Sequence, residues 1–285
     1  MTDDLERRYR RLLRAYPKQY RAAHGEELAG TLMEAARPGS RRPSLRETRH
    51  LLAGAFAVRV RAARPAGVPP WADGLHLGAL VVALFTFARF PVLPYFAYEV
   101  WTVLGVVLTV ALVRGWMWVA APLALFAALW TSWPMIAGGF FTPALDIGPL
   151  FGDLAPVAPY WVIAVVSTTL AVRRGATMPA RSLWWLLVPP AGWMLQLTQM
   201  PTWEAAWVVP RAGLEVVALL LVLAATIAAR DGRLALAAAV HLFPGLVYLA
   251  ENLPHTSARG FLYWGVLTTL VLSSLAAARR AHARV

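Results

Sequence analysis

The sequence predicts an all-α membrane protein with a small three-helix cytoplasmic head, about eight transmembrane helices and both termini in the cytoplasm. Composition is the first observation: 59% of the residues are hydrophobic and 15% are charged, whereas globular domains are about 45–50% apolar and about 25% charged. The second is a series of apolar segments between residues 75 and 278, each close to the roughly 20 residues of a membrane span. The third is the alternating charge of the turns between them.

The head is predicted at residues 1–64. These residues hold 15 Lys and Arg against seven Asp and Glu, a surplus of +8 within the net charge of +12. The first residues are too charged for the apolar core of a secretory signal, so we expect the N-terminus to stay in the cytoplasm. Apolar residues recur at helical spacing in three stretches, which are separated at Pro17 and at the Pro- and Gly-containing residues 37–43. Three short amphipathic helices are expected to build one small core.

The third head helix has a defined start. Ser44 is followed three residues later by Glu47, the capping-box spacing that satisfies free amide groups at the beginning of a helix. Its predicted apolar stripe consists of Leu45, Leu52 and Phe56, with Leu51 and Ala55 beside it.

The stretch from Leu12 to Ala35 resembles the short cytoplasmic prefix found on many bacterial membrane proteins. The matching elements are Tyr-Pro, an aromatic-Arg pair and Gly-Glu-Glu-Leu, and they cover about a tenth of the chain. Similar prefixes occur on permease-like proteins of export systems and on multi-spanning proteins associated with PadR-type regulators or sigma factors. The resemblance implies a docking or regulatory module without catalytic residues. The candidate partner-docking residues are Tyr16, Pro17, Tyr20, Arg21, Gly25, Glu26, Glu27 and Leu28.

Eight membrane spans are predicted after a Pro- and Gly-rich linker at residues 65–74, within a bundle at residues 75–278 that ends in a basic tail at residues 279–285. Several of them are slightly shorter than 20 apolar residues, which flanking aromatic and basic side chains accommodate. The predicted spans are Leu75–Phe90, Ala97–Val113, Trp116–Ala137, Ala155–Val172, Leu183–Met200, Ala212–Ala229, Leu234–Ala250 and Gly260–Ala278.

Charge in the turns predicts the topology. An excess of Lys and Arg marks the cytoplasmic side of a membrane protein. No odd-numbered turn has a net positive count, whereas every even-numbered turn and the tail are basic, which places both termini in the cytoplasm. The basic residues of the even turns and the tail are Arg114, Arg173, Arg174, Arg181, Arg230, Arg233, Arg279, Arg280 and Arg284.

Ionisable residues inside spans are functional candidates by default. Two interpretations compete for the four that lie towards the outer ends of spans: they line an outward-opening polar cavity, or they are interfacial charges that reach water, with Arg89 and Glu99 paired across the first hairpin. The complete candidate polar site is His241, Glu215, Glu251, Arg89 and Glu99.

His241 differs from the other candidates because it lies near the middle of its span. Pro244 follows it and removes a helical hydrogen bond, so a kink is expected there. Transporters place binding sites at such irregular helices, whereas a buried histidine bonded to a neighbouring helix is the competing interpretation. Gly74 and Gly78 form a single GxxxG pair, a motif of helix dimerisation.

Motifs of ATP hydrolysis, zinc proteolysis, serine hydrolysis and dinucleotide binding are missing, and cysteine is absent. We therefore expect no enzyme, cofactor or metal site, and no direct binding of nucleic acid. The leading hypothesis is a sensor or regulatory anchor of the cytoplasmic membrane whose basic head docks a cytoplasmic protein such as a transcriptional regulator. The alternative is a permease or exporter component that works with a separate ATPase. Membrane lipids are expected partners in both cases, and a homo-oligomer is possible.

Overall fold

The computed structural model describes residues 2–36, 40, 42–88, 98–136, 157–174, 178–191 and 204–282. Every regular element in these ranges is helical, which confirms the all-α class. The elements are α1 (Thr2–Leu13), α2 (Lys18–Glu34), α3 (Leu45–Ala62), α4 (Pro70–Ala88), α5 (Tyr98–Arg114), α6 (Met117–Ile136), α7 (Ala158–Arg174), η3 (Leu183–Leu187), α9 (Glu204–Ala229), α10 (Arg233–Glu251), η5 (Leu253–His255) and α11 (Ala258–His282).

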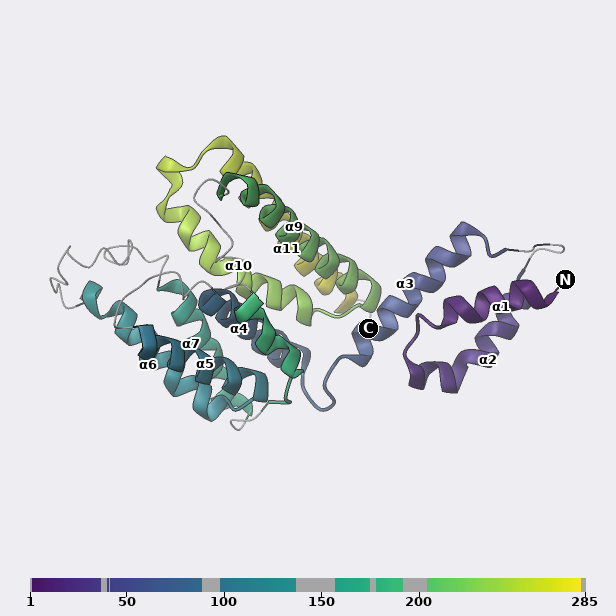
Figure 1. Cartoon of the computed structure of the whole chain (residues 1–285), viewed down its shortest axis with the longest axis horizontal. Helices are drawn as coiled ribbons and strands as arrows, with labels where there is room; N and C mark the ends of the chain where they lie inside the picture. The colour runs from purple at the N-terminus through teal and green to yellow at the C-terminus, as the bar shows by residue number, and fades with distance from the viewer. Residues whose placement is uncertain are drawn as a thin grey trace.

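The head consists of α1, α2 and α3, and α3 runs from this group to the rest of the molecule (Figure 1). The predicted capping box is confirmed: Glu47 N donates to Ser44 Oγ at 3.2 Å, and Ser44 N donates to Glu47 Oε2 at 2.9 Å. Tyr9 of α1 donates its hydroxyl to the same Glu47 carboxylate at 2.8 Å. The start of α3 is therefore fixed both locally and by α1. The buried core of the head is Leu5, Tyr9, Leu13, Tyr16, Ala29, Leu51 and Ala55.

The stripe predicted for α3 faces outward rather than into this core. Leu51 and Ala55 pack against α1 and α2, whereas Leu45 is 90% exposed and Leu52 is 47% exposed. Phe56 lies on the same open face, because positions i, i+7 and i+11 of a helix point in nearly one direction. The stripe is therefore one of two apolar faces of α3, and the two short partner helices cover only the other face, that of Leu51 and Ala55.

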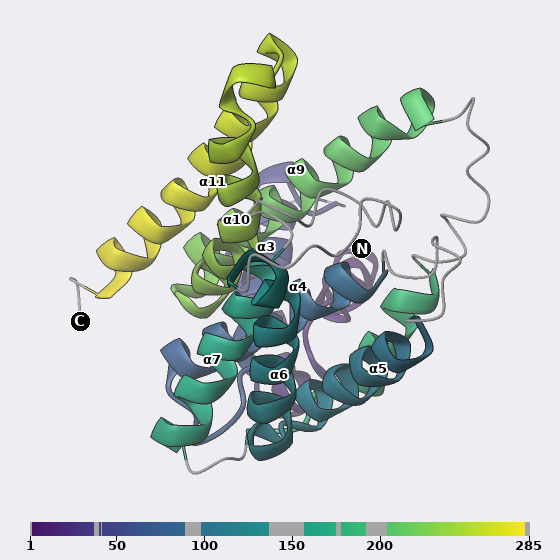
Figure 2. The same cartoon turned by 90° about the vertical axis from the view of Figure 1, so that its left-hand side faces the viewer.

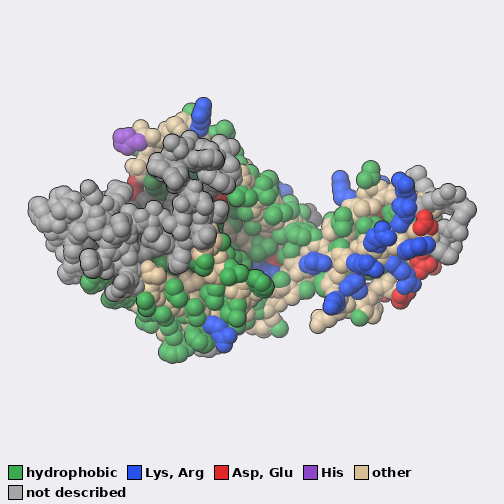
Figure 3. All heavy atoms as spheres, viewed as in Figure 1, with side chains coloured by type: hydrophobic (Ala, Val, Ile, Leu, Met, Phe, Trp, Pro, Cys, Tyr) green, Lys and Arg blue, Asp and Glu red, His purple; other side chains and the backbone are tan. Residues whose placement is uncertain are grey.

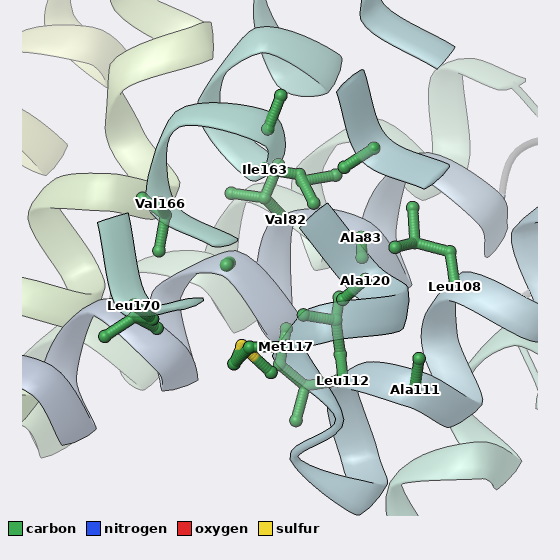
Figure 4. Close-up of a cluster of buried hydrophobic side chains, with 14 of the residues drawn as sticks. Val82, Ala83, Leu108, Ala111, Leu112, Met117, Ala120, Ile163, Val166 and Leu170 are labelled. Atoms are coloured by element: carbon green, nitrogen blue, oxygen red, sulfur yellow. The ribbon is translucent and has the colours of Figure 1, made fainter. Parts of the chain in front are cut away.

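The bundle divides into two helix groups. The first contains α4, α5, α6 and α7, whose buried side chains converge in Figure 4. The second contains α9, α10 and α11 and has its own smaller core. Figure 2 shows the two groups on opposite sides, and α4 and α10 form the most extensive contact between them. The residues labelled in Figure 4 are Val82, Ala83, Leu108, Ala111, Leu112, Met117, Ala120, Ile163, Val166 and Leu170.

The GxxxG pair allows α4 and α10 to approach each other. A Cβ atom on Gly74 would lie 2.6 Å from the Arg233 carbonyl oxygen, and one on Gly78 would lie 2.6 Å from Val240 Cβ. Both distances are too short for a carbon atom, so only glycine permits this packing. Small residues let helix backbones come together, and here they do so within one chain.

The number of predicted spans needs correction, because four helices rather than eight are long and apolar enough to cross a membrane. Three further apolar helices are shorter within the described residues. The fifth predicted span begins as the 3-10 helix η3 and reaches Pro189 and Pro190, which cannot donate backbone hydrogen bonds; its remainder lies outside the described residues. The four candidate spans are Pro70–Phe87, Ala212–Ala229, Arg233–Glu251 and Ala258–Ala281, and the shorter helices are Thr102–Arg114, Met117–Ser132 and Ala158–Arg173.

The head and the bundle differ in the kind of side chains that they expose. Figure 3 shows a largely hydrophobic surface over the bundle and a concentration of Lys and Arg on the head. Large apolar side chains such as Val103, Trp130, Leu214 and Leu262 are each more than half exposed on the bundle. A soluble monomer rarely exposes apolar area on this scale, so the bundle is suited to a lipid environment.

Candidate functional site

A buried ionic cluster lies where the head meets the bundle. Asp73, in the first turn of α4, is fully buried. Its carboxylate accepts hydrogen bonds from two arginines: Arg233 Nη1 donates to Oδ2 at 2.9 Å, and Arg181 Nη2 donates to Oδ1. An isolated buried charge is costly, and paired charges with further hydrogen bonds offset that cost. Asp73 therefore joins two segments that are far apart in the sequence.

Arg233, the first residue of α10, is the most connected member of the cluster. Besides Asp73, its guanidinium donates to the carbonyl oxygens of Val60 and Ala63, at 2.5 Å and 3.1 Å. These carbonyls belong to the last turn and C-cap of α3, where helix carbonyls lack intrahelical partners and attract cations. Asp231 adds a second carboxylate, with its Oδ2 2.9 Å from Arg233 Nε. One side chain thus connects α10 with α4 and with the head.

Arg181 enters the cluster from the segment between α7 and η3. Its backbone N–H donates to the Val113 carbonyl at 2.7 Å, and Met178 N–H donates to the Gly115 carbonyl at 2.8 Å. Gly115 has a φ of +73°, which favours glycine, and a Cβ there would meet the Met178 carbonyl. Burial lowers the pKa of the Arg181 guanidinium, and the Asp73 carboxylate opposes that shift. The segment is therefore held by backbone hydrogen bonds and by one desolvated ion pair.

His76 extends the buried polar groups one turn further into α4. Its side chain is fully buried, and its Nε2 lies 2.7 Å from the Leu112 carbonyl oxygen of α5. Its Nδ1 has no hydrogen-bond partner among the described residues. The imidazole therefore links α4 to α5, as Asp73 links α4 to α10.

The sequence prediction missed this cluster. Asp73 was assigned to the linker, although α4 begins at Pro70 and already includes it. Arg181 and Arg233 were used only as topology signals, and His76 was passed over inside the GxxxG pair. The available signal was an acidic residue and a histidine three positions apart, on one helix face at the start of an apolar run.

A cavity of about 560 Å³ lies between α4, α9, α10 and α11, and it brings together two of the five predicted intramembrane residues. Glu215 of α9 and His241 of α10 both line it, along with the aromatic rings of Phe85, Trp185 and Trp264. Most of the remaining lining is aliphatic. Ligand sites typically combine apolar walls of this size with a few polar groups.

The two polar residues of the cavity differ in their partners. Glu215 Oε2 accepts a hydrogen bond from the Tyr263 hydroxyl of α11. The His241 ring packs against Phe85, with ring centroids 4.9 Å apart. Its Nδ1 is buried and has no hydrogen-bond partner among the described residues, so the interpretation of His241 as a histidine bonded to a neighbouring helix gains no support.

The other three predicted residues are not brought to this cavity. Glu251 ends α10, ten residues or about 15 Å along the helix from His241, and it is not among the lining residues. Arg89 lies outside the described residues. Glu99 is part of α5, but its side chain is outside what the structure describes. Pro244 lies inside α10, which continues through it to Glu251.

Half of the predicted docking residues of the head have contacts that hold its helices together. Tyr16 is buried and stacks on Tyr20, with centroids 5.2 Å apart, and its hydroxyl lies over Gly54 of α3. Glu26 forms a two-pronged ion pair with Arg10 of α1, at 3.0 Å and 2.9 Å. Leu28 is partly buried and packs against the core of the head. Pro17 precedes α2, and Gly25 lies within α2 beside Arg21. Glu27 lies near His24 of the same helix.

Among the described residues there is no group of three or more His, Asp or Glu that could hold a metal ion. No protein-family model, no curated protein and no solved structure matches this chain.

Proposed function

We propose that this protein is a non-enzymatic sensor and regulatory anchor of the bacterial cytoplasmic membrane. In this proposal the bundle responds to a ligand or to its membrane, and the head holds a cytoplasmic transcriptional regulator in a state that the bundle sets. The observation that carries the proposal is Arg233, which starts a cavity-lining helix and donates two hydrogen bonds to the end of the head helix α3.

The connection between bundle and head is short and buried. Arg233 and His241 lie on the same helix, eight residues or about 12 Å apart along its axis. A shift or rotation of α10 that follows occupation of the cavity moves the guanidinium that holds Val60 and Ala63. Coupling of this kind needs a packed element that contacts both sites, and α10 is such an element.

The docking surface that we propose is the outward stripe of α3, formed by Leu45, Leu52 and Phe56. These side chains are exposed, and Arg49 and Arg59, which are exposed on the same helix, are basic. An apolar patch bordered by cations suits a protein partner with an apolar centre and an acidic rim. The net charge of the head supports the same type of partner.

The orientation of the protein follows from its charges. Basic turns and the basic head are proposed to face the cytoplasm, with both termini on that side. The Asp73 cluster then lies at the cytoplasmic end of the bundle, next to the partner that the head holds.

The test uses full-length protein purified from native membranes in mild detergent, with co-purifying proteins identified by mass spectrometry. A variant with both Leu52→Asp and Phe56→Asp is expected to lose a soluble DNA-binding regulator that the wild type retains. The control is His50→Asp, which adds a negative charge at an exposed position about 140° around the helix from the stripe. Equal recovery of the regulator from all three proteins would contradict the docking surface.

The same experiment addresses the alternative function. The cavity between the two helix groups also suits a permease or exporter component that works with a separate ATPase. Recovery of a nucleotide-binding ATPase in place of a regulator would favour that alternative and would overturn the sensor-anchor proposal.

A further inference from the structure

The cavity between α4, α9, α10 and α11 combines three features that select a ligand by charge. It holds a carboxylate from Glu215, aromatic rings from Phe85, Trp185 and Trp264, and otherwise mainly aliphatic walls. Aromatic faces attract cations through the ring quadrupole, and the attraction grows when the cation is removed from water. A carboxylate in the same cavity attracts cations and repels anions.

His241 provides a second, independent observation. It lines the same cavity, and its Nδ1 is buried without a hydrogen-bond partner among the described residues. Buried polar atoms in folded proteins are nearly always satisfied, and among the described residues that have an unpartnered buried polar atom, His241 is the one that lines this cavity. An occupant with an N–H group beside its positive charge would satisfy this nitrogen.

We propose that this cavity binds an organic cation with an apolar body, with Glu215 as its counter-ion and the aromatic rings around its charge. The volume of about 560 Å³ suits a compact molecule of drug-like size. The open lipid-facing surface of α9 and α11 allows such a molecule to arrive from the membrane. That this cation is the ligand which the protein senses rests on the proposed function. Binding of the cation to the cavity is measured directly and does not use the head as a readout.

The test compares two probes of nearly the same size and shape, tetraphenylphosphonium and tetraphenylborate, which carry opposite charge. Binding to the full-length protein is measured by equilibrium dialysis in detergent, with protein-free micelles as the blank. Tetraphenylphosphonium is expected to bind saturably, and tetraphenylborate is expected to show no saturable binding. Equal affinity for both ions would overturn the proposal, because the cavity would then be an unselective apolar space.

Three variants locate the site. Glu215→Gln keeps the shape and is expected to raise the Kd for tetraphenylphosphonium at least about tenfold. Glu251→Gln removes the same charge outside the cavity and is expected to leave the Kd unchanged. Ala218→Trp introduces a large side chain at an exposed lining position and is expected to block binding without disturbing the core. An unchanged Kd in Glu215→Gln would overturn the proposal even if Ala218→Trp blocked binding.

Two kinds of molecule have a positive charge joined to an apolar body: a free lipophilic compound and a lipid with an ammonium headgroup. Vesicles of phosphatidylglycerol alone are compared with vesicles that also contain phosphatidylethanolamine. Competition by phosphatidylethanolamine would identify the lipid headgroup, and unchanged binding would identify a free compound; both results support a cation site. If tetraphenylphosphonium binds while the head loses no partner in the docking variants, the sensor proposal fails and this inference stands.

Discussion

Helix α10 carries two groups of buried polar side chains that contrast in what surrounds them: charged and carbonyl partners at one, a cavity at the other. At its start, Arg233 has carboxylate and carbonyl acceptors from α3, α4 and the preceding turn. About two turns further, His241 lines a cavity and leaves Nδ1 without a partner among the described residues. In the first group the charges are paired within the chain, as a structural joint requires. The second has, within the described part of the chain, no charged partner within hydrogen-bond distance of its imidazole and adjoins a cavity, as a ligand site requires.

The comparison shows that burial of a charge does not by itself identify a binding site. Both groups meet the general expectation that ionisable residues within membrane helices are functional. What separates them is that Arg233 has several hydrogen-bond acceptors within the chain, whereas His241 lies beside a cavity. The ionic cluster is therefore expected to matter most for stability and coupling, and the cavity for ligand affinity.

The largest effect is expected from Asp73→Ala. This change leaves two arginines buried without their shared carboxylate, and breaking a buried ion pair from one side costs about 3–5 kcal/mol. The free energy of unfolding, measured by denaturation of the purified protein in detergent, is the readout. Asp4→Ala, at an exposed position of α1, serves as the control and should change it by less than about 0.5 kcal/mol. A similar small change for Asp73→Ala would show that the cluster is not a structural joint.

A smaller effect is expected where α4 meets α10. Gly78→Ala places a Cβ atom 2.6 Å from Val240 Cβ, and overpacking of this kind costs about 1–3 kcal/mol. The matched control is Gly265→Ala in α11, where a Cβ meets open space and removal of glycine stabilises the helix by about 0.5–1 kcal/mol. Changes of the same sign in the two variants would contradict the close packing of α4 on α10.

The smallest effect at neutral pH is expected in the head, where Tyr9→Phe removes a single hydrogen bond worth about 1 kcal/mol. The pH dependence is more informative. Burial, together with the hydrogen bond to Glu47, raises the pKa of Tyr9 from 10.0 to about 12. Because the folded head favours the protonated phenol, its contribution to stability is fully present below pH 10 and is lost as the pH rises through about 12.

Near-ultraviolet absorbance of tyrosinate checks this prediction in the full-length protein. The difference between the titration of the wild type and that of Tyr9→Phe isolates Tyr9 and should have its midpoint near pH 12. A midpoint near the ordinary value of 10 would mean that Tyr9 is not buried against Glu47.

Local chemistry was predictable from the sequence, whereas long-range pairing was not. Ser44 and Glu47 are three residues apart, so their capping box could be read directly, and it is present. Asp73 pairs with residues 108 and 160 positions away, and no spacing rule connects such distant residues. Arg181 and Arg233 looked like ordinary topology signals because a basic residue in a turn has the same pattern whether it meets water or a buried carboxylate.

The candidate cavity shows the same limit. Glu215 and His241 were each predicted from their positions within apolar runs, and the structure places both on one cavity. Glu251 was predicted for the same polar site from its place at the outer end of the span, and it lies at the end of α10, away from the cavity. Which residues of different helices converge depends on how the helices pack, here on the two glycines that bring α4 against α10. The predicted number of spans was wrong for a related reason, because apolar composition alone does not determine where helices end.

The central claim is that the bundle sets the position of the head through Arg233. The chain contains no cysteine, so Ala22→Cys in α2 and Ala276→Cys in α11, both exposed positions, allow specific spin labelling of head and bundle. The distance distribution between the two labels is measured with and without saturating tetraphenylphosphonium. A shift in the labelled wild type that disappears in Arg233→Gln, while that variant still binds the cation, is the predicted result. An unchanged distribution in the wild type, or the same shift in Arg233→Gln, would contradict the claim.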